Sequence, residues 1–289
     1  MNFQEPLPMV RSPRTLQEAY ELLAEHADSI RVIAGGTDLM VLMNAHQLSD
    51  RSLLNIWALD ELRGITEDPD RVRIGALCTY TQIIGSAIIR RSAPSLISAS
   101  VTVGAVQIQN RGTLGGNIVN ASPAGDTLPV LIAYDAELEI GSAAGTRTVP
   151  INQFYTGYRK TVLKPNELLL AIQLPKLKPN ERDFFWKVGT RRAQAISKTV
   201  LAAKASLSEH MIESIAIGVG SVAPTVIRAR RTEELLSRVG IGRDLIAQAR
   251  AEISKDISPI TDLRSTEHYR RTVTGNVLVK FLRELSSRQ

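Results

Sequence analysis

The sequence predicts an α+β protein built from more than one domain, and three observations support this fold class. The chain has 289 residues, which is long for one compact core and suits two or three domains of ordinary size. Strand-like and helical segments are mixed up to Pro175. After the linker-like segment 176–180, three strand-like segments precede the helices that close the chain. We therefore expect one domain at residues 1–176, subdivided into about 1–57 and 58–176, and a second domain at residues 180–289.

The first 57 residues are predicted to form a small βαβ unit. Thr15 and Glu18 have the spacing of a helix-capping box, and an amphipathic helix follows. A strand at residues 30–34 leads into the diglycine turn 35–38, then a helix at 39–43 and a strand at 53–56. Such a turn directs backbone N–H groups and the positive end of a helix dipole toward a ligand. By itself, the turn fits an anion site and an ordinary tight turn equally well.

Residues 58–176 are predicted to combine a sheet with short helices. The expected helices follow apolar or amphipathic patterns and lie at residues 79–91, 94–103 and 128–133. The expected strands lie at residues 72–77, 137–140, 147–150 and 167–175. A glycine-containing hairpin is expected to join the two middle strands.

Between these elements, residues 110–126 concentrate four glycines, five side-chain amides or hydroxyls and one carboxylate, Asp126. Glycine lets a backbone approach a ligand closely, and successive exposed N–H groups form a nest for an anion such as phosphate. The carboxylate suits a ligand with hydroxyl groups, such as a ribose or ribityl chain. Asp126 also suits the N-cap of the helix expected after Thr127, and the two roles are compatible. We interpret this stretch as half of a nucleotide-binding cradle, with the diglycine turn as candidate for the other half.

The C-terminal region is predicted to be strand-rich and then helical. The expected strands lie at residues 184–189, 195–207 and 213–220, and the expected helices at 232–238, 244–255 and 269–285. The segment from Gly218 to Ala223 matches the letters of a dinucleotide fingerprint, but that motif must open a helix. Because Pro224 and β-branched residues follow, we expect a strand and a turn there.

Composition excludes several classes of site. The net charge is +6, but its basic clusters at 228–231 and 270–271 are not interleaved with aromatic residues, so nucleic-acid binding is disfavoured. One cysteine, Cys78, cannot form a disulfide or hold an iron–sulfur cluster within this chain, and the four histidines lack metal-binding spacing. Neither a signal peptide nor an apolar run of roughly 18 residues is present, so we expect a cytoplasmic protein without a membrane span.

No pattern of nucleophile and base indicates a catalytic residue. Neither glycine stretch continues as a P-loop, which disfavours ATP hydrolysis. Lys187, in the middle of an expected strand, fits a solvated lysine at least as well as a charge beside a cofactor. The chain is therefore predicted to hold a cofactor that performs its own chemistry.

Taken together, the glycine motifs at residues 33–39 and 110–126 make the chain resemble the FAD-binding subunit of the molybdenum hydroxylases. This is the group of xanthine dehydrogenase and carbon monoxide dehydrogenase. The resemblance continues through residues 154–161, 167–169, 187–189 with Arg191, and 265–271, and covers nearly the whole chain. It implies a two-part FAD-binding domain of the vanillyl-alcohol oxidase and p-cresol methylhydroxylase type, followed by a smaller α/β domain.

The resemblance also implies the cofactor contacts. The first motif and residues 113–117 would hold the FAD pyrophosphate, Asp126 would lie near the ribityl chain, and Leu169 and Lys187 would lie beside the flavin. The full set of implied FAD-binding residues is Ile33, Ala34, Gly35, Gly36, Thr37, Asp38, Leu39, Thr113, Leu114, Gly115, Gly116, Asn117, Asp126, Leu169 and Lys187.

Family members of this kind work with two partner subunits. One carries two [2Fe-2S] clusters and the other a molybdopterin cofactor. The resemblance implies that electrons pass from the clusters through FAD to NAD⁺ or another acceptor. The alternative is a structural or assembly subunit that has the same fold and has lost the cofactor.

Overall fold

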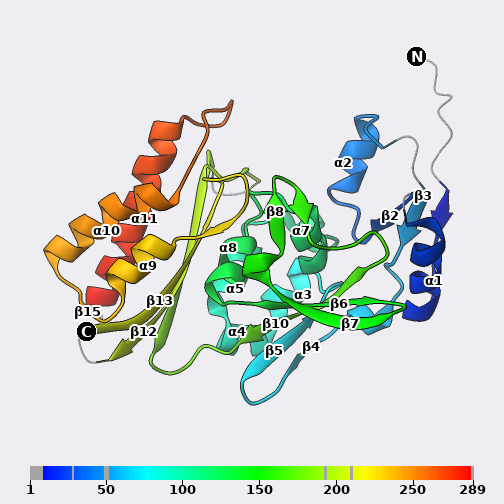
Figure 1. Ribbon diagram of the computed structural model, residues 1–289, viewed down its shortest axis with the longest axis horizontal. Coiled ribbons are helices and arrows are strands. Elements are labelled where there is room, and N and C mark those ends of the chain that lie inside the picture. The colour runs from blue at the N-terminus through cyan, green and yellow to red at the C-terminus, as the bar shows by residue number, and fades with distance from the viewer. Residues whose placement is uncertain (1–8, 28, 49–51, 192–193, 209–210, 288–289) are drawn as a thin grey trace.

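The computed structural model describes residues 9–27, 29–48, 52–191, 194–208 and 211–287, arranged around three main sheets. Figure 1 shows the N-terminal unit in blue at one end and the C-terminal domain, ending in orange and red helices, at the other. The cyan and green middle unit lies between them. Each main sheet has its own buried apolar cluster. The fold is α+β, as predicted.

The N-terminal unit is a parallel sheet with the strand order β1-β3-β2. Its elements are β1 (Val10–Arg11), α1 (Leu16–His26), β2 (Ile30–Ile33), α2 (Leu39–Asn44) and β3 (Ser52–Asn55). The Thr15 hydroxyl accepts the Glu18 N–H and caps α1, as expected. The Glu18 carboxylate, however, accepts the N–H of Arg14. The reciprocal half of the predicted capping box is therefore not formed.

The middle unit is an antiparallel sheet covered by short helices, with the strand order β4-β5-β10-β6-β7. Its sheet strands are β4 (Ile65–Glu67), β5 (Arg71–Gly75), β6 (Glu137–Ser142), β7 (Gly145–Pro150) and β10 (Leu168–Pro175). A small hairpin pairs β8 (Tyr155–Gly157) with β9 (Lys160–Thr161). The helices are α3 (Tyr80–Gly85), α4 (Ala87–Ser92), α5 (Pro94–Ser100), α6 (Val106–Gln109), α7 (Leu114–Asn120) and α8 (Leu128–Ala133), with 3₁₀ turns at Asp60–Leu62 and Ile151–Gln153.

Several features of the middle unit differ from the sequence prediction, which did not include β4, α6 or the β8–β9 hairpin. The helix expected at residues 79–91 is broken at Ser86, which is extended and caps α4 by accepting the N–H of Ile89 at 3.3 Å. Helix α7 was not predicted, because glycine disfavours helices and the stretch suggested a nest. The Thr113 hydroxyl accepts the N–H of Gly116 at 3.0 Å, which caps this short helix.

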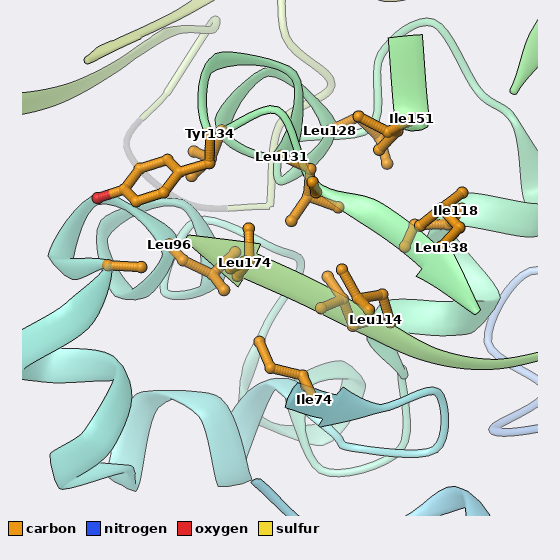
Figure 2. Packing of buried hydrophobic residues seen from close by; sticks show 14 of the residues in the cluster. Ile74, Leu96, Leu114, Ile118, Leu128, Leu131, Tyr134, Leu138, Ile151 and Leu174 are labelled. Carbon is orange, nitrogen blue, oxygen red and sulfur yellow. The ribbon is translucent and has the colours of Figure 1, made fainter. Parts of the chain in front are cut away.

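The core of the middle unit lies between the sheet and helices α5, α7 and α8. Figure 2 shows Leu114 and Ile118 of α7 near Leu138 of β6, while Leu96 and Tyr134 lie near Leu174 of β10. These side chains are almost completely buried. Burial of one face explains why the 3.6-residue and 2-residue apolar periods predicted most elements here.

The C-terminal domain is a sheet with the order β11-β12-β13-β14, in which β15 also pairs with β13. Its strands are β11 (Glu181–Val188), β12 (Thr199–Ser208), β13 (Met211–Gly220), β14 (Ile227–Arg228) and β15 (Val239–Gly240). Helices α9 (Arg230–Leu236), α10 (Arg243–Asp256) and α11 (Glu267–Ser287) cover one face, and α8 of the middle unit packs on β12 and β13 (Figure 1).

The segment that matches a dinucleotide fingerprint is a strand and a turn, as predicted. Gly218 and Gly220 end β13, and a Cβ on Gly218 would lie 2.1 Å from the carbonyl oxygen of Pro129. This glycine therefore permits close packing of β13 on α8. Among the described residues, no helix is long and apolar enough to cross a membrane.

Candidate cofactor cleft

A cleft of about 1860 Å³ is lined by residues from all three units. Most of the predicted site residues line it: Ala34, Gly35, Gly36, Thr37, Asp38, Leu39, Thr113, Gly115, Gly116, Asn117, Asp126 and Leu169. Three do not: Leu114 is fully buried in the core, Ile33 lies in β2, and Lys187 lies in β11 behind Asp126. The volume exceeds the roughly 300–1,000 Å³ of ordinary small-molecule pockets, so an extended ligand fits.

Two glycine segments from different units meet along this cleft. We call residues 35–39 the first wall and residues 111–117 the second wall. A Cβ on Gly35 would lie 1.8 Å from the carbonyl oxygen of Arg111, so only glycine allows the two backbones to touch there. The sequence interpretation that the two stretches form halves of one cradle agrees with this contact.

The first wall presents free backbone donors. Gly36 has φ of +80°, which favours glycine, and it lies in the turn between β2 and α2. The N–H groups of Gly36, Thr37 and Asp38 donate to no described acceptor. Exposed backbone donors at such a turn are suited to a phosphate group.

The second wall differs from the expected nest of free N–H groups. The amide of Leu114 donates to the Cys78 carbonyl at 3.0 Å and that of Gly115 to the Ala76 carbonyl at 3.0 Å. The amides of Gly116 and Asn117 both donate to Thr113, through its hydroxyl and its carbonyl. This wall therefore offers a ligand its shape and its polar side chains, while its amides hold the fold together.

The glycines of the second wall also serve packing. A Cβ on Gly115 would lie 2.6 Å from the carbonyl oxygen of Ala76, and one on Gly116 would lie 2.8 Å from the capping hydroxyl of Thr113. Helix α7 can therefore sit directly on the segment that follows β5 only because these residues lack side chains.

Asp126 and Lys187 form a buried ion pair at the cleft. The Lys187 Nζ donates to Asp126 Oδ2 at 2.6 Å and to the carbonyl of Thr102 at 3.0 Å, and the two side chains are 9% and 10% exposed. The alternative that Lys187 is a solvated lysine is therefore wrong. The pair joins β11 of the C-terminal domain to the middle unit across 61 residues of sequence.

The second carboxylate oxygen of Asp126 is left for a ligand. Asp126 Oδ1 is buried and has no hydrogen-bond partner among the described residues. Burial raises the pKa of Asp126 to about 6, and the positive charge of Lys187 limits the rise. The interpretation of Asp126 as the N-cap of α8 is wrong. Thr127 occupies the N-cap without a side-chain capping bond, and its hydroxyl donates to the Asn117 side chain at 2.8 Å.

Leu169 lies at an irregularity in β10. Leu169 pairs with Ile140 of β6, and Ala171 pairs with the adjacent residue, Glu139. Strand β10 therefore has one extra residue between these two pairs, which is a β-bulge. Such bulges redirect side chains and are common beside functional sites. Leu168 and Leu169 both line the cleft and give it an apolar region.

Sequence reasoning assigned no role to two further groups that line the cleft. Arg270 of α11 is 4% exposed and donates to the Ser221 carbonyl at 2.6 Å and to Asp262 at 2.7 Å. Asn120 of α7 donates to Asp38 at 3.0 Å and accepts from Arg159 at 2.9 Å. Arg159 and Arg270 lie in segments that contributed to the family resemblance, and this was the only indication of a role in the sequence. Their partners Asn120 and Ser221 are remote in sequence.

The cleft suits an extended ligand with phosphates, hydroxyl groups and an apolar ring system. The free N–H groups of the first wall match phosphate, the unpaired oxygen of Asp126 matches a ligand hydroxyl, and the leucines of β10 match a ring. FAD has each of these parts, so the residues present fit the cofactor expected from the sequence.

Comparison with known proteins agrees with this geometry. Residues 2–177 match the family model described as the FAD binding domain in molybdopterin dehydrogenase, and residues 184–285 match the CO dehydrogenase flavoprotein C-terminal domain. A putative xanthine dehydrogenase FAD-binding subunit of Escherichia coli is 33% identical over 270 residues, covering 91% of this chain and 92% of that protein. The glyceraldehyde dehydrogenase medium chain of Sulfolobus acidocaldarius is 32% identical, covering 94% and 96%.

The fold is also similar to that of a chain in a solved carbon monoxide dehydrogenase structure. The structure of a carbon monoxide dehydrogenase from Hydrogenophaga pseudoflava that lacks the Mo-pyranopterin moiety contains a chain with a TM-score of 0.92 and 27% identity. The match covers 95% of this chain and 96% of that chain.

Proposed function

Because this chain belongs to the family of FAD-binding subunits of the molybdopterin dehydrogenases, we propose that it passes electrons from partner [2Fe-2S] clusters to NAD⁺ or another acceptor. The chain is an oxidoreductase subunit whose cofactor is FAD. Bound FAD would supply the chemistry, since its ring system accepts and releases electrons. The residues of this chain bind the cofactor, orient it and exclude water from it.

The observation that carries this proposal is the meeting of the two walls along one cleft that also contains the unpaired oxygen of Asp126. We propose that the walls hold the FAD pyrophosphate and that Asp126 lies near the ribityl chain. Leu169 lies beside the flavin in this proposal, and Lys187 acts there through its ion pair with Asp126. These are the roles expected from the sequence, restricted to the residues that line or support the cleft.

The partners in this proposal are a molybdopterin-binding large subunit and a small subunit with two [2Fe-2S] clusters, working in the cytoplasm. Relatives are named for xanthine and for glyceraldehyde although their medium chains are similar to this one. This supports a division of labour in which the substrate binds to another subunit. We also propose the domain division 1–176 and 180–289, with subdomains at about 1–57 and 58–176, which is supported by the change of sheet between Pro175 and Glu181.

The experiment that tests the cofactor role is purification of the full chain, alone and with its partner subunits, followed by measurement of flavin absorbance. We expect about one FAD per chain, and a much lower content in Gly35→Val, because a side chain there would force the walls apart. A colourless wild-type protein that takes up no added FAD would instead support the cofactor-free assembly subunit. Electron transfer is tested by flavin bleaching when substrate is added to the assembled complex without an acceptor.

A further inference from the structure

Trp57 lies at the joint between the N-terminal unit and the second wall. One residue, Ile56, separates it from β3, and its N–H donates to the Asn55 side chain at 3.1 Å. Its carbonyl accepts a hydrogen bond from Arg63. The main chain at Trp57 is therefore held on both sides, and its half-buried ring has a defined place beside the cleft wall.

The ring of Trp57 is stacked against two arginines. The guanidinium carbon of Arg111 lies 3.8 Å from the ring centroid and that of Arg63 lies 4.7 Å from it. At 3.8 Å the guanidinium is in stacking contact with the indole, an arrangement that a planar arginine makes better than a lysine. Arg111 forms no salt bridge with any described residue, so the indole is the principal described contact of its charged group.

Arg111 contacts the N-terminal unit twice, once with its side chain and once with its backbone carbonyl. Its guanidinium stacks on Trp57, which belongs to the N-terminal unit, while its carbonyl oxygen lies against Gly35 of the first wall. The backbone contact with Gly35 is a van der Waals contact and supplies no directional bond. The peptide group that contains this carbonyl is held by the N–H of Gly112, which donates to the Ile108 carbonyl at 2.6 Å, and the stack on Trp57 adds a side-chain constraint on the same residue.

We propose that Trp57 is a positioning residue for the cofactor: by stacking on Arg111 it fixes the spacing of the two walls and so sets the affinity for FAD. This inference rests on the proposed function of the cleft. It assigns the effect to a side chain that does not itself line the cleft and acts only through Arg111.

The test is a titration of FAD-depleted full-length chain with FAD, followed by quenching of flavin fluorescence. We expect Trp57→Leu and Arg111→Met each to raise the FAD dissociation constant about three- to tenfold, the change that a partly buried cation–π stack supports. Trp57→Phe, which keeps an aromatic face, should recover most of the affinity. The double variant should bind FAD no more weakly than Trp57→Leu, because removing the indole already removes its contact with Arg111.

Trp186 provides the matched control. It is the second tryptophan of the chain, and it also makes a cation–π contact, with Lys280 Nζ 4.6 Å from its ring centroid. It lies in β11 and does not line the cleft. Trp186→Leu should leave the FAD dissociation constant unchanged, while any general loss of stability from removing a tryptophan would appear in both proteins.

The proposal is overturned if folded Trp57→Leu keeps the wild-type FAD dissociation constant, whatever its thermal midpoint. It is also overturned if Trp57→Phe is as weak as Trp57→Leu, or if the effects of the two single variants simply add. Should Trp57→Leu fail to fold, Arg111→Met decides alone, because Arg111 is exposed and its replacement leaves the core intact. If wild-type protein binds no FAD, the proposed function fails first; if wild type binds and the variants match it, only this inference fails.

Discussion

In the first wall of the cleft, Gly36 has a positive φ and the amides beside it donate to no described residue, whereas in the second wall the amides of residues 114–117 all have acceptors. Both walls are rich in glycine, yet glycine is required for a different physical reason in each wall. Gly36 is required by its backbone conformation, and Gly115 is required because Ala76 lies against its Cα. The same composition therefore indicates a ligand-facing turn in one place and a tightly packed helix in the other.

The largest effect that separates the walls is expected at Gly115. Gly115→Ala places a Cβ against main-chain atoms of Ala76, which cannot move without disturbing β5, so we expect a loss of about 3 kcal/mol in the free energy of unfolding. Urea denaturation measures it. Gly85→Ala is the control, because nothing lies within 4 Å of a Cβ there, and it should be neutral. Equal stability of the two variants would contradict the packing role.

Lys187→Met tests the ion pair behind the cleft, where β11 of the C-terminal domain meets the middle unit. It leaves Asp126 without its partner, and we expect a loss of about 2 kcal/mol at pH 8, below the usual cost of breaking a buried pair because the carboxyl can take up a proton. Lys255→Met removes an exposed pair with Glu252 and should change stability by less than about 0.5 kcal/mol. Similar losses in both variants would show that the Lys187 pair is not special.

Gly36→Ala perturbs the first wall without crowding it. The nearest atoms to a new Cβ lie 3.5 Å away, so only the positive φ is strained, and we expect a loss of about 1 kcal/mol in stability. FAD affinity should fall more than stability does, in contrast to Gly115→Ala. A variant with unchanged FAD affinity would argue that the first wall does not bind the cofactor.

The smallest expected effect is a pH dependence from Asp126. Its folded pKa of about 6 lies above that of an unfolded aspartate, so the folded state binds the proton more tightly. The resulting stability is fully present below the unfolded pKa and is lost as pH rises through about 6, which amounts to about 1 kcal/mol between pH 5 and pH 7. Asp126→Asn should remove this component from unfolding curves measured over that range.

Glu167 provides the contrast for that measurement. Hydrogen bonds from Arg147 hold its pKa below the ordinary value, so its stabilising contribution is present above the unfolded pKa and is lost as pH falls. Glu167→Gln should therefore change the pH profile in acid only, in the opposite direction to Asp126→Asn. Parallel changes in both variants would contradict the assignment of the pH 6 component to Asp126.

Much of the fold was predictable because its elements bury apolar side chains. Strands 168–175 and 211–220 contain the apolar runs of buried strands, the C-terminal helices show the apolar period of half-buried helices, and Pro175 ends the strand before the linker at 176–180. Helix α7 was missed because its glycines have a low helix propensity, and tertiary contact with Ala76 outweighs that preference. The cap at Thr113 was the local indication of this helix.

The sequence by itself determined the apolar periods, the glycine positions and the absence of a second cysteine, and through its resemblance the identity of the cofactor. Only the tertiary structure decided that Asp126 pairs with Lys187, that Gly35 touches Arg111, and that Arg111 stacks on Trp57. The reason is physical: periodicity and turn chemistry are local properties of neighbouring residues. An ion pair, a backbone contact and a stack between remote residues exist only after the three units have packed together.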